Sequence, residues 1–386
     1  MMEPTVRFPE FKDSWNNYKI EDMFDRVGTP VDLDDTQTYR EIGIRSHGKG
    51  IFHKEETTAT EIGNKRVFWV EPDCFVVNIV FAWERAVAKT TEKENGMIAS
   101  HRFPMYKPKK DIVDLDYITE YFITKRGQNV LILASPGGAG RNKTLGQKEF
   151  AKSVVKLPSL PEQQKIAEFL STIDTVIEKQ KETVSAWEER KKGVMQKLFS
   201  QEVRFKADDG SDFPEWEEKK LGECCDILDS KRKPISKENR VLGKYAYYGS
   251  TNIQDYINEY LFDEPLVLLA EDAGPFDDFW NKAIAQFATG KFWVNNHAHV
   301  LRPHENRKYF FYSLEHRDIR VYINNPSRGK LNQEDMVKIP MYIPCLAEQQ
   351  KIADCLSSLD EVIEKQKATL AAWEELKKGL LQQMFV

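Results

Sequence analysis

The sequence predicts a mixed α+β protein with an internal pseudo-two-fold repeat. Two α/β modules alternate with two long helices, and the helices pack on each other as an antiparallel coiled coil. Three observations predict this fold class. A segment in the middle of the chain is repeated at its end, both copies carry a heptad pattern of apolar residues, and the segments between them contain short strand-like runs.

The repeat is a gap-free match between residues 158–199 and 344–385. At an offset of about 186, roughly 27 of some 42 positions are identical. A weaker echo precedes each copy, where Leu145-Gly-Gln-Lys-Glu-Phe150 resembles Leu331-Asn-Gln-Glu-Asp-Met336. The chain therefore divides into four segments, and about residues 25–140 of the first are unrelated in sequence to about residues 226–325 of the third. The four segments are a module at 1–157, a helix at 158–202, a second module at 203–343 and a second helix at 344–386.

Each repeated segment carries apolar residues spaced alternately four and three apart, which is the heptad seam of a coiled coil. One polar Gln lies near the middle of each seam, where a polar residue fixes register at some cost in stability. The predicted seam of the helix pair consists of Ile166, Leu170, Ile173, Ile177, Gln180, Val184 and Trp187 in the first copy, and Ile352, Leu356, Leu359, Ile363, Gln366, Leu370 and Trp373 in the second.

The two helices are expected to pack on each other within one chain. A two-fold axis across them would make them antiparallel and bring Gln180 close to Gln366. The alternative is a coiled coil between two chains. Pro161 lies at the start of the first helix, whereas Ala347 takes its place in the second, so the sequence leaves the start of the second helix open.

The two modules contain β-branched and aromatic runs broken by Gly and Pro, which are typical of strands in a mixed α/β fold. We expect a short helix at Tyr309–His316, and the sequence does not predict the strand order. The expected strands are Val67–Val70, Phe75–Phe81, Tyr245–Tyr248, Leu266–Ala270 and Phe292–Val294.

The composition is that of a globular protein, with 41% hydrophobic and 30% charged residues. The N-terminal residues lack the pattern of a signal peptide, and no run of apolar residues is long enough to span a membrane. Five scattered cysteines are typical of reduced thiols, so a cytoplasmic location is expected. The net charge of −5 does not indicate nucleic acid by itself, but the charge is unevenly distributed.

Basic loops interrupt both modules, most clearly at 141–152 and 231–244. Lys and Arg bind phosphates, while Arg, Asn, Ser and His side chains discriminate base edges. Each of these segments could instead be a solvated loop or a turn cap. The candidate DNA-binding residues are Arg45, Ser46, His47, Lys49, Ser100, His101, Arg102, Arg141, Lys143, Thr144, Lys231, Arg232, Lys233, Ser250, Thr251, Asn252, Asn295, Asn296, His297, His299, Arg328 and Lys330.

The sequence predicts no catalytic residues, no metal site and no cofactor bound by this chain. Residues 43–50 and 137–144 approach the phosphate-binding loop, but each lacks one required residue: Gly50 replaces Ser or Thr, and Asn142 replaces Gly. His297 and His299 have no carboxylate or cysteine at a useful sequence spacing to complete a metal site. No polar-Pro-Pro-aromatic tetrad for a flipped adenine is present.

The alternation of modules and repeated helices resembles the specificity subunits of type I restriction–modification systems. The resemblance covers nearly the whole chain. It is carried by Leu-Pro-Ser-Leu-Pro-Glu-Gln-Gln-Lys-Ile-Ala at 157–167, by the matching Glu-Gln-Gln-Lys-Ile-Ala at 348–353, and by Ser135–Lys143 and Trp293–His299 within the modules.

The resemblance implies that each module is a target-recognition domain that reads one half of a split DNA site. It implies that the helix pair sets the length of the unspecified spacer. It also implies two modification subunits, which bind S-adenosylmethionine and methylate adenine at N6, and restriction subunits that use ATP and magnesium. A two-headed scaffold for proteins, and a complex that only methylates, remain as alternatives. Neither the recognised bases nor the spacer length is predicted.

Overall fold

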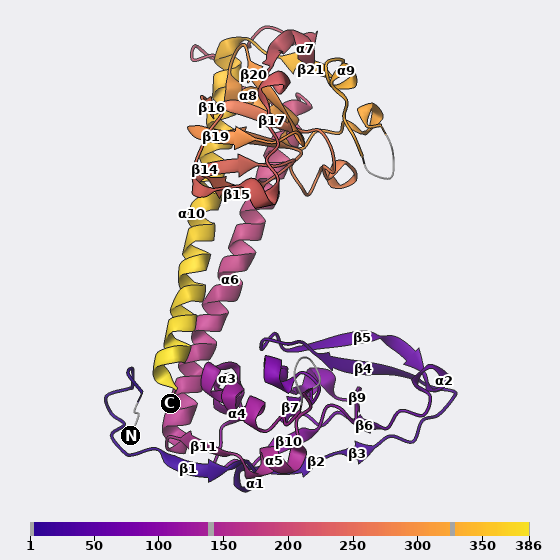
Figure 1. The fold of residues 1–386 in the computed structure, drawn as a ribbon, viewed down its shortest axis with the longest axis vertical. Helices are drawn as coiled ribbons and strands as arrows, with labels where there is room; N and C mark the ends of the chain where they lie inside the picture. The colour runs from indigo at the N-terminus through magenta and orange to yellow at the C-terminus, as the bar shows by residue number, and fades with distance from the viewer. Residues whose placement is uncertain (1–3, 138–142, 325–328, 386) are drawn as a thin grey trace. The chain divides into compact units, whose positions relative to one another are not determined.

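A computed structural model of the chain describes residues 4–137, 143–324 and 329–385. These residues form two units (Figure 1). The first comprises Met1–Lys181 and Ala368–Val386, and the second comprises Glu182–Lys367. Each unit therefore contains one module and parts of both long helices. The fold class predicted from the sequence is confirmed.

The first module contains two principal sheets. One has four strands, in the order β2 (Phe24–Val27), β10 (Met105–Pro108), β7 (Phe75–Val77) and β8 (Val87–Lys89). The other has five strands, in the order β3 (Thr29–Pro30), β6 (Val67–Trp69), β9 (Ile98–Ser100), β4 (Thr38–Ile44) and β5 (Ile51–Thr58). The module also contains helices α3 (Leu115–Ile123), α4 (Lys125–Leu133) and α5 (Gln147–Lys152), and the two-stranded sheet of β1 (Asn16–Lys19) and β11 (Val154–Leu157).

The second module repeats this plan. Its first sheet runs β13 (Cys225–Ile227), β20 (Ala298–Pro303), β17 (Leu266–Ala270) and β18 (Ala285–Ala288). Its second sheet runs β15 (Ile253–Ile257), β14 (Leu242–Tyr248), β19 (Lys291–Val294) and β16 (Phe262–Asp263). Helices α8 (Arg307–Glu315) and α9 (Gln333–Met336) follow, and β12 (Glu217–Lys220) pairs with β21 (Pro340–Ile343). The pseudo-two-fold repeat thus extends into modules whose sequences are unrelated.

Most of the predicted strands lie within strands of the structure, but one is shorter than expected. The run Phe75–Phe81 was expected to be one strand, yet β7 ends at Val77. The side chain of Asn78 accepts a hydrogen bond from the backbone N–H of Val80 at 3.1 Å, and the N–H of Phe81 bonds to the carbonyl of Asn78. This side-chain bond turns the backbone away from the strand direction, although the residues that follow are apolar.

The two long helices are α6 (Leu160–Phe199) and α10 (Leu346–Met384). Both begin at the same position of the repeat, so replacing Pro161 by Ala347 does not move the helix start. Of the predicted seam residues, the buried ones are Ile166, Leu170, Ile173, Ile177, Val184, Ile352, Leu356 and Ile363, and the half-buried ones are Gln180, Trp187, Leu359, Gln366, Leu370 and Trp373.

Ion pairs give the direction of helix packing in each unit. In the first unit, Lys377 of α10 binds Asp174 of α6 at 2.7 Å. In the second unit, Lys191 of α6 binds Asp360 of α10 at 2.7 Å. Each pair joins an early residue of one helix to a late residue of the other, so the helices run antiparallel.

A glutamate from each module completes these ion pairs, but the two glutamates differ. Glu315 accepts from Lys191 Nζ at 3.0 and 2.8 Å. Although burial alone would lower it, the pKa of Lys191 is raised by Glu315 and Asp360. Glu120 is 3.4 Å from Lys377 Nζ, and its Oε2 has no partner among the described residues. Burial raises the pKa of Glu120. The second unit therefore has the better satisfied cluster.

The start of each helix is fastened to its module by the same residues of the repeat. Arg7 binds Glu162 at 2.7 Å, and Arg204 binds Glu348 at 2.8 Å. The amide of Gln163 likewise accepts from the N–H of Asp114, as Gln349 accepts from Asn306. Buried carboxylate–guanidinium and amide contacts of this kind require both partners. They explain why the Glu-Gln-Gln motif occurs twice.

Candidate nucleic-acid interface

The predicted DNA-binding segments of the first module meet at one edge of its five-stranded sheet. Strands β4 and β9 are parallel, so their carboxyl ends lie at the same edge. Arg45–Lys49 follow β4, and His101–Arg102 follow β9. We call residues 45–49 and 100–102 the first strand-end edge. Polar side chains that the sequence separates by more than fifty positions are brought together here.

The second module has the same arrangement. Strands β14 and β19 are parallel, with Tyr248 opposite Val294 at their carboxyl ends. Ser250–Asn252 follow β14, and Asn295–His297 follow β19. We call residues 249–252 and 295–297 the second strand-end edge. All four segments proposed to read bases thus occupy equivalent places in the two modules.

In each module, two further segments connect to the strand-end edge through matching backbone hydrogen bonds. In the first module, the N–H of Ile79 donates to Arg102 at 3.0 Å, and the N–H of Leu145 donates to Ile79 at 2.8 Å. In the second, Glu271 donates to His297 at 2.9 Å, and Leu331 donates to Glu271 at 2.7 Å. The segments that end at Thr144 and Lys330 therefore run beside the two edges. Arg102 and His297 occupy equivalent positions in this pattern.

The predicted residues differ in how accessible they are. Exposed side chains belong to Arg45, His47, Lys49, His101, Arg102, Thr144, Lys231, Lys233, Asn252, Asn296 and Lys330. Half-buried side chains belong to Ser46, Ser100, Lys143, Arg232, Ser250, Thr251 and His297. Asn295 and His299 are buried, and Arg141 and Arg328 lie outside the described residues.

Burial changes the interpretation of Asn295 and His299. Asn295 accepts from the N–H of His297 at 2.7 Å and donates to Gln254 at 3.2 Å, so it shapes the turn after β19. His299 is 1% exposed, and its Nδ1 and Nε2 contact Asp229 and the carbonyl of Leu331. In this conformation neither side chain faces solvent. Both side chains hold the second strand-end edge in place, so neither is a candidate for a direct contact with DNA.

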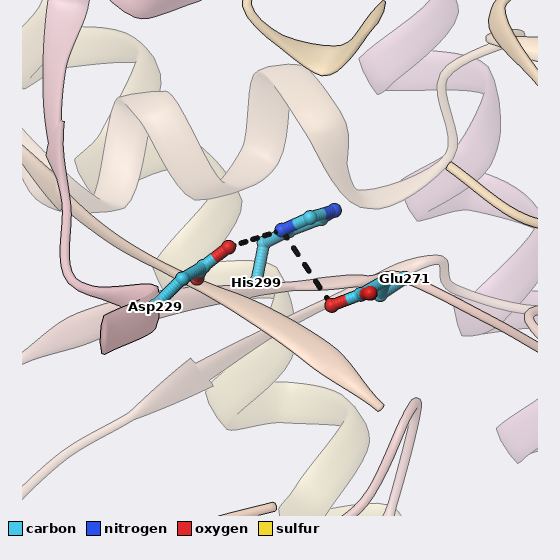
Figure 2. Close-up of side chains that lie close together, drawn as sticks. All are labelled: Asp229, Glu271 and His299. Atoms are coloured by element: carbon cyan, nitrogen blue, oxygen red, sulfur yellow. Dashed lines mark hydrogen bonds and ion pairs between the residues drawn. The ribbon is translucent and has the colours of Figure 1, made fainter. Parts of the chain in front are cut away.

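The carboxylates around His299 are a second difference from the sequence-based expectation. Asp229 and Glu271 lie 2.6 and 3.9 Å from the same nitrogen of the His299 ring, Nδ1 (Figure 2). Three such groups have the composition of a metal site. Arg232 already binds both carboxylates, however, with Nη1 2.5 Å from Glu271 and Nη2 3.3 Å from Asp229. A guanidinium is therefore the cation of this cluster.

This cluster holds the Arg232 side chain inside the module instead of at the surface. Its side chain is 14% exposed, and Nη1 also donates to the carbonyl of Ala298 at 2.7 Å. Its neighbours Lys231 and Lys233 are exposed. The basic loop at 231–244 thus has two surface lysines on either side of an arginine that binds inside the module.

His297 has a carboxylate partner that the sequence analysis missed. Its Nδ1 lies 2.7 Å from Asp272 Oδ1, while the side chain of His297 remains 39% exposed. The hydroxyl of Ser250 donates to the backbone carbonyl of Asp272 at 2.6 Å. Asp272 comes directly after the buried run Leu266–Ala270 and Glu271, and a polar residue at that place in a strand pattern was an available signal.

The first strand-end edge is built from different side chains. Ser46 donates to Glu84 at 2.9 Å, and the guanidinium of Arg45 lies 4.7 Å from the ring centre of Phe52. His47 has a positive φ of 63°, and its N–H donates to the carbonyl of Glu84 at 2.7 Å. No hydrogen bond or ion pair of the Arg102 guanidinium is found in the described part of the chain. Arg102 is therefore open to an outside acceptor.

Residues 43–50, which approach the phosphate-binding loop in sequence, span the end of β4 and the connection to β5. A phosphate-binding loop runs from a strand into a helix, whereas this loop joins two antiparallel strands. The second near match lies mainly outside the described residues. In the described part of the chain, no helix is long and apolar enough to cross a membrane.

Comparison with known proteins supports the fold and the repeat. The model of the family described as "Type I restriction modification DNA specificity domain" matches residues 12–185 and 214–372. A Haemophilus influenzae protein described as a type I restriction enzyme specificity subunit is 37% identical over 147 residues, covering 38% of this chain and 37% of that protein. The MjaVIII specificity subunit of Methanocaldococcus jannaschii is 24% identical over 269 residues, covering 61% and 62%. The matched segments span less than two thirds of both relatives.

Two solved structures share the fold over nearly the whole chain. The S subunit of a type I restriction–modification system from M. genitalium has a TM-score of 0.58 at 16% identity, covering 100% of this chain and 99% of that one. A chain from a study of assembly and conformational transition of the type I system has a TM-score of 0.57 at 16% identity, covering 97% and 98%.

Proposed function

Because the chain belongs to the type I restriction–modification DNA specificity domain family, we propose that it selects a bipartite DNA sequence for partner enzymes. Each module binds one half of the site through its strand-end edge, and an unspecified spacer separates the halves. The observation that carries this proposal is the placement of the candidate readers. Segments chosen from the sequence alone converge on the same edge of the same sheet in both modules.

The candidate contacts divide into two kinds. Arg45, Arg102 and His297 stand at the strand ends and are proposed to contact base edges, together with Ser46, Ser100, His101, Ser250, Thr251, Asn252 and Asn296. The lysines nearby, Lys49, Lys143, Lys231, Lys233 and Lys330, are proposed to bind phosphates, as are His47, Thr144, Arg141 and Arg328. Phosphate contacts supply affinity without sequence preference, and base-edge contacts supply the discrimination.

The chain itself is proposed to be non-catalytic and to act in the cytoplasm. Two modification subunits would bind S-adenosylmethionine, flip the target adenine and methylate it at N6. Restriction subunits would use ATP and magnesium to cleave unmodified DNA. The paired helices α6 and α10 are proposed to set the length of the spacer, because each is fastened to a module at its start by the Arg–Glu and Gln contacts.

Methylation mapping tests the proposal. The chain is co-expressed with its cognate modification subunit in a host that lacks adenine methylation, and the methylated adenines of the genome are then sequenced. We expect one split motif, methylated once on each strand. A folded complex that methylates nothing would favour a protein-binding scaffold.

The same assay tests the helix pair as a ruler. Removing two turns from both α6 and α10, at equivalent positions of the repeat, is expected to shorten the spacer between the two half-sites. The half-sites themselves are expected to stay the same, because the modules are intact. An unchanged spacer in a complex that still methylates would exclude the ruler.

A further inference from the structure

We propose that His297 and Asp272 form a base-reading pair at the second strand-end edge. In this pair, Asp272 fixes the orientation and tautomer of the His297 ring, and His297 Nε2 accepts a hydrogen bond from the amino group of an adenine or cytosine. The inference rests on the proposed function and deepens it. It assigns one base of the second half-site to one side chain.

The tautomer follows from the chemistry of the two partners. A carboxylate oxygen only accepts hydrogen bonds, and Asp272 Oδ1 lies 2.7 Å from His297 Nδ1. Nδ1 therefore carries a proton and donates it to Asp272. In the neutral ring, Nε2 is then left with its lone pair. Among the described residues Nε2 has no partner, and the side chain is 39% exposed, so its one acceptor atom is available to a ligand.

Contacts with neighbouring residues fix the positions of Asp272 and His297. Glu271 and Asp272 are neighbours in sequence, and each contacts one of the two histidines that flank Ala298. Inside the module Glu271 lies with Asp229 beside His299 (Figure 2), and Arg232 binds both carboxylates. On the other side, Ser250 holds the carbonyl of Asp272. A reading group supported by a second layer of contacts loses little conformational freedom on binding.

The acceptor determines which bases fit. In the major groove, adenine offers its N6 amino group and cytosine its N4 amino group, whereas guanine and thymine offer acceptors at the corresponding position. A lone pair on His297 Nε2 attracts an amino group and repels guanine O6 or thymine O4. On the strand that the ring faces, the pair thus selects adenine or cytosine and rejects guanine and thymine.

Methylation mapping with three variants tests this inference. His297→Ala removes the acceptor, so one position of one half-site should become degenerate, with a loss of discrimination of roughly 5- to 100-fold. The other half-site and the spacer should stay unchanged. Asp272→Asn should relax the same position, because an amide accepts or donates and so permits both ring tautomers. A residue that merely supported the fold would weaken methylation of all sites equally.

His304 provides a matched control. It lies at the far end of the same strand β20, roughly 23 Å along the strand from His297. Its Nε2 is 3.1 Å from Asp226 Oδ1, which lowers the pKa of Asp226, so it is also a histidine–carboxylate pair. His304→Ala should leave the recognised sequence unchanged.

The outcomes separate this inference from the proposed function. No methylation by the wild-type complex contradicts the function itself. Methylation by the wild type with an unchanged motif for His297→Ala overturns the base-reading pair. If His297→Ala abolishes methylation, competition binding decides, using the purified complex and duplexes altered one position at a time. Equal affinity for all four bases at a single position supports the pair, and unchanged preferences throughout overturn it.

Discussion

The two strand-end edges have the same backbone arrangement but carry different hydrogen-bonding side chains. Arg102 and His297 occupy equivalent places, because their carbonyls accept backbone hydrogen bonds from Ile79, two residues after β7, and from Glu271, directly after β17. Arg102 is exposed and has no partner in the described residues, whereas His297 is held by Asp272. A free guanidinium offers only donors, while the histidine offers an acceptor. One fold can therefore present opposite hydrogen-bonding groups to DNA without moving its backbone.

The residues that support the two edges also differ in polarity. Under His297 lies the charged cluster of Arg232, Glu271 and His299. At the positions equivalent to Glu271 and His299, the first module has Ile79 and Pro104, which are apolar. The second edge is therefore stabilised by buried charges that must all be present, and the first edge by packing.

Removing Arg232 should have the largest effect. Arg232→Ala leaves Asp229 and Glu271 without their shared cation at 10% and 14% exposure, and removing one partner of a buried pair costs about 3–5 kcal/mol. Denaturant unfolding of the second module measures the loss. The matched control is Arg302→Ala, whose pair with Glu264 is about one third exposed and should cost below about 1 kcal/mol. Equal losses for both variants would contradict the structural role of Arg232.

Glu315 and Glu120, which each contact a lysine of a long helix, should respond unequally when they are replaced by glutamine. Glu315→Gln removes the negative charge beside buried Lys191 and replaces one of its two accepting oxygens by a donor, and it should lower the free energy of unfolding by about 2–3 kcal/mol. Glu120→Gln should lower it by no more than about 0.5 kcal/mol at neutral pH, because Oε2 has no partner to lose.

The pH dependence of the Glu120 variant gives a sharper test. Burial raises the pKa of folded Glu120, so its ionisation costs stability once the pH rises above the unfolded value of about 4.3. Relative to the wild type, Glu120→Gln should therefore gain stability as the pH rises from about 4 to 7. Unfolding curves at several pH values measure this difference, and a difference that shrinks toward pH 7 would refute the assignment.

Arg102→Ala should change specificity rather than stability. Arginine pairs with guanine O6 and N7, and losing such a contact costs about 1–3 kcal/mol of discrimination. Methylation mapping should show one degenerate position, a guanine in the wild-type motif, in the half-site that His297→Ala leaves intact. Arg40→Ala, in the middle of β4 and paired with Glu56, is the control and should leave the motif unchanged. If the Arg102 and His297 variants both became degenerate in the same half-site, the two edges would not read different half-sites.

The smallest effect is expected for the lysines. Lys49 has no partner in the described residues, so Lys49→Ala should reduce the salt dependence of DNA binding by about one phosphate contact. Lys330 lies 3.5 Å from Glu271, which partly neutralises it, so Lys330→Ala should reduce the slope less. Binding titrations between about 50 and 200 mM salt measure both slopes, and sequence preference should be unaffected in each case.

The sequence by itself determined the repeat and the two long helices, and it predicted that the helices pack on each other. Heptad spacing and the doubled Glu-Gln-Gln motif are local patterns, and α6 and α10 begin at the same position of the repeat. The four candidate segments were also chosen from the sequence, but only the two in the second module follow strands that the sequence predicts, because β4 and β9 were not among the expected strands. Their acidic neighbours in the second module were not predicted: Asp272 and Glu271 lie 25 and 28 residues before the histidines that they contact.

Only the tertiary structure decided which polar residues face solvent. His297 and His299 are two residues apart at the start of β20, yet the first is half-buried with 39% of its side chain exposed and the second is buried among Asp229, Glu271 and Arg232. No composition rule separates them, because their environments come from β17 and the loop after β13, which are distant in sequence. The direction of a side chain follows from the strand, but what it meets there depends on how the sheets pack.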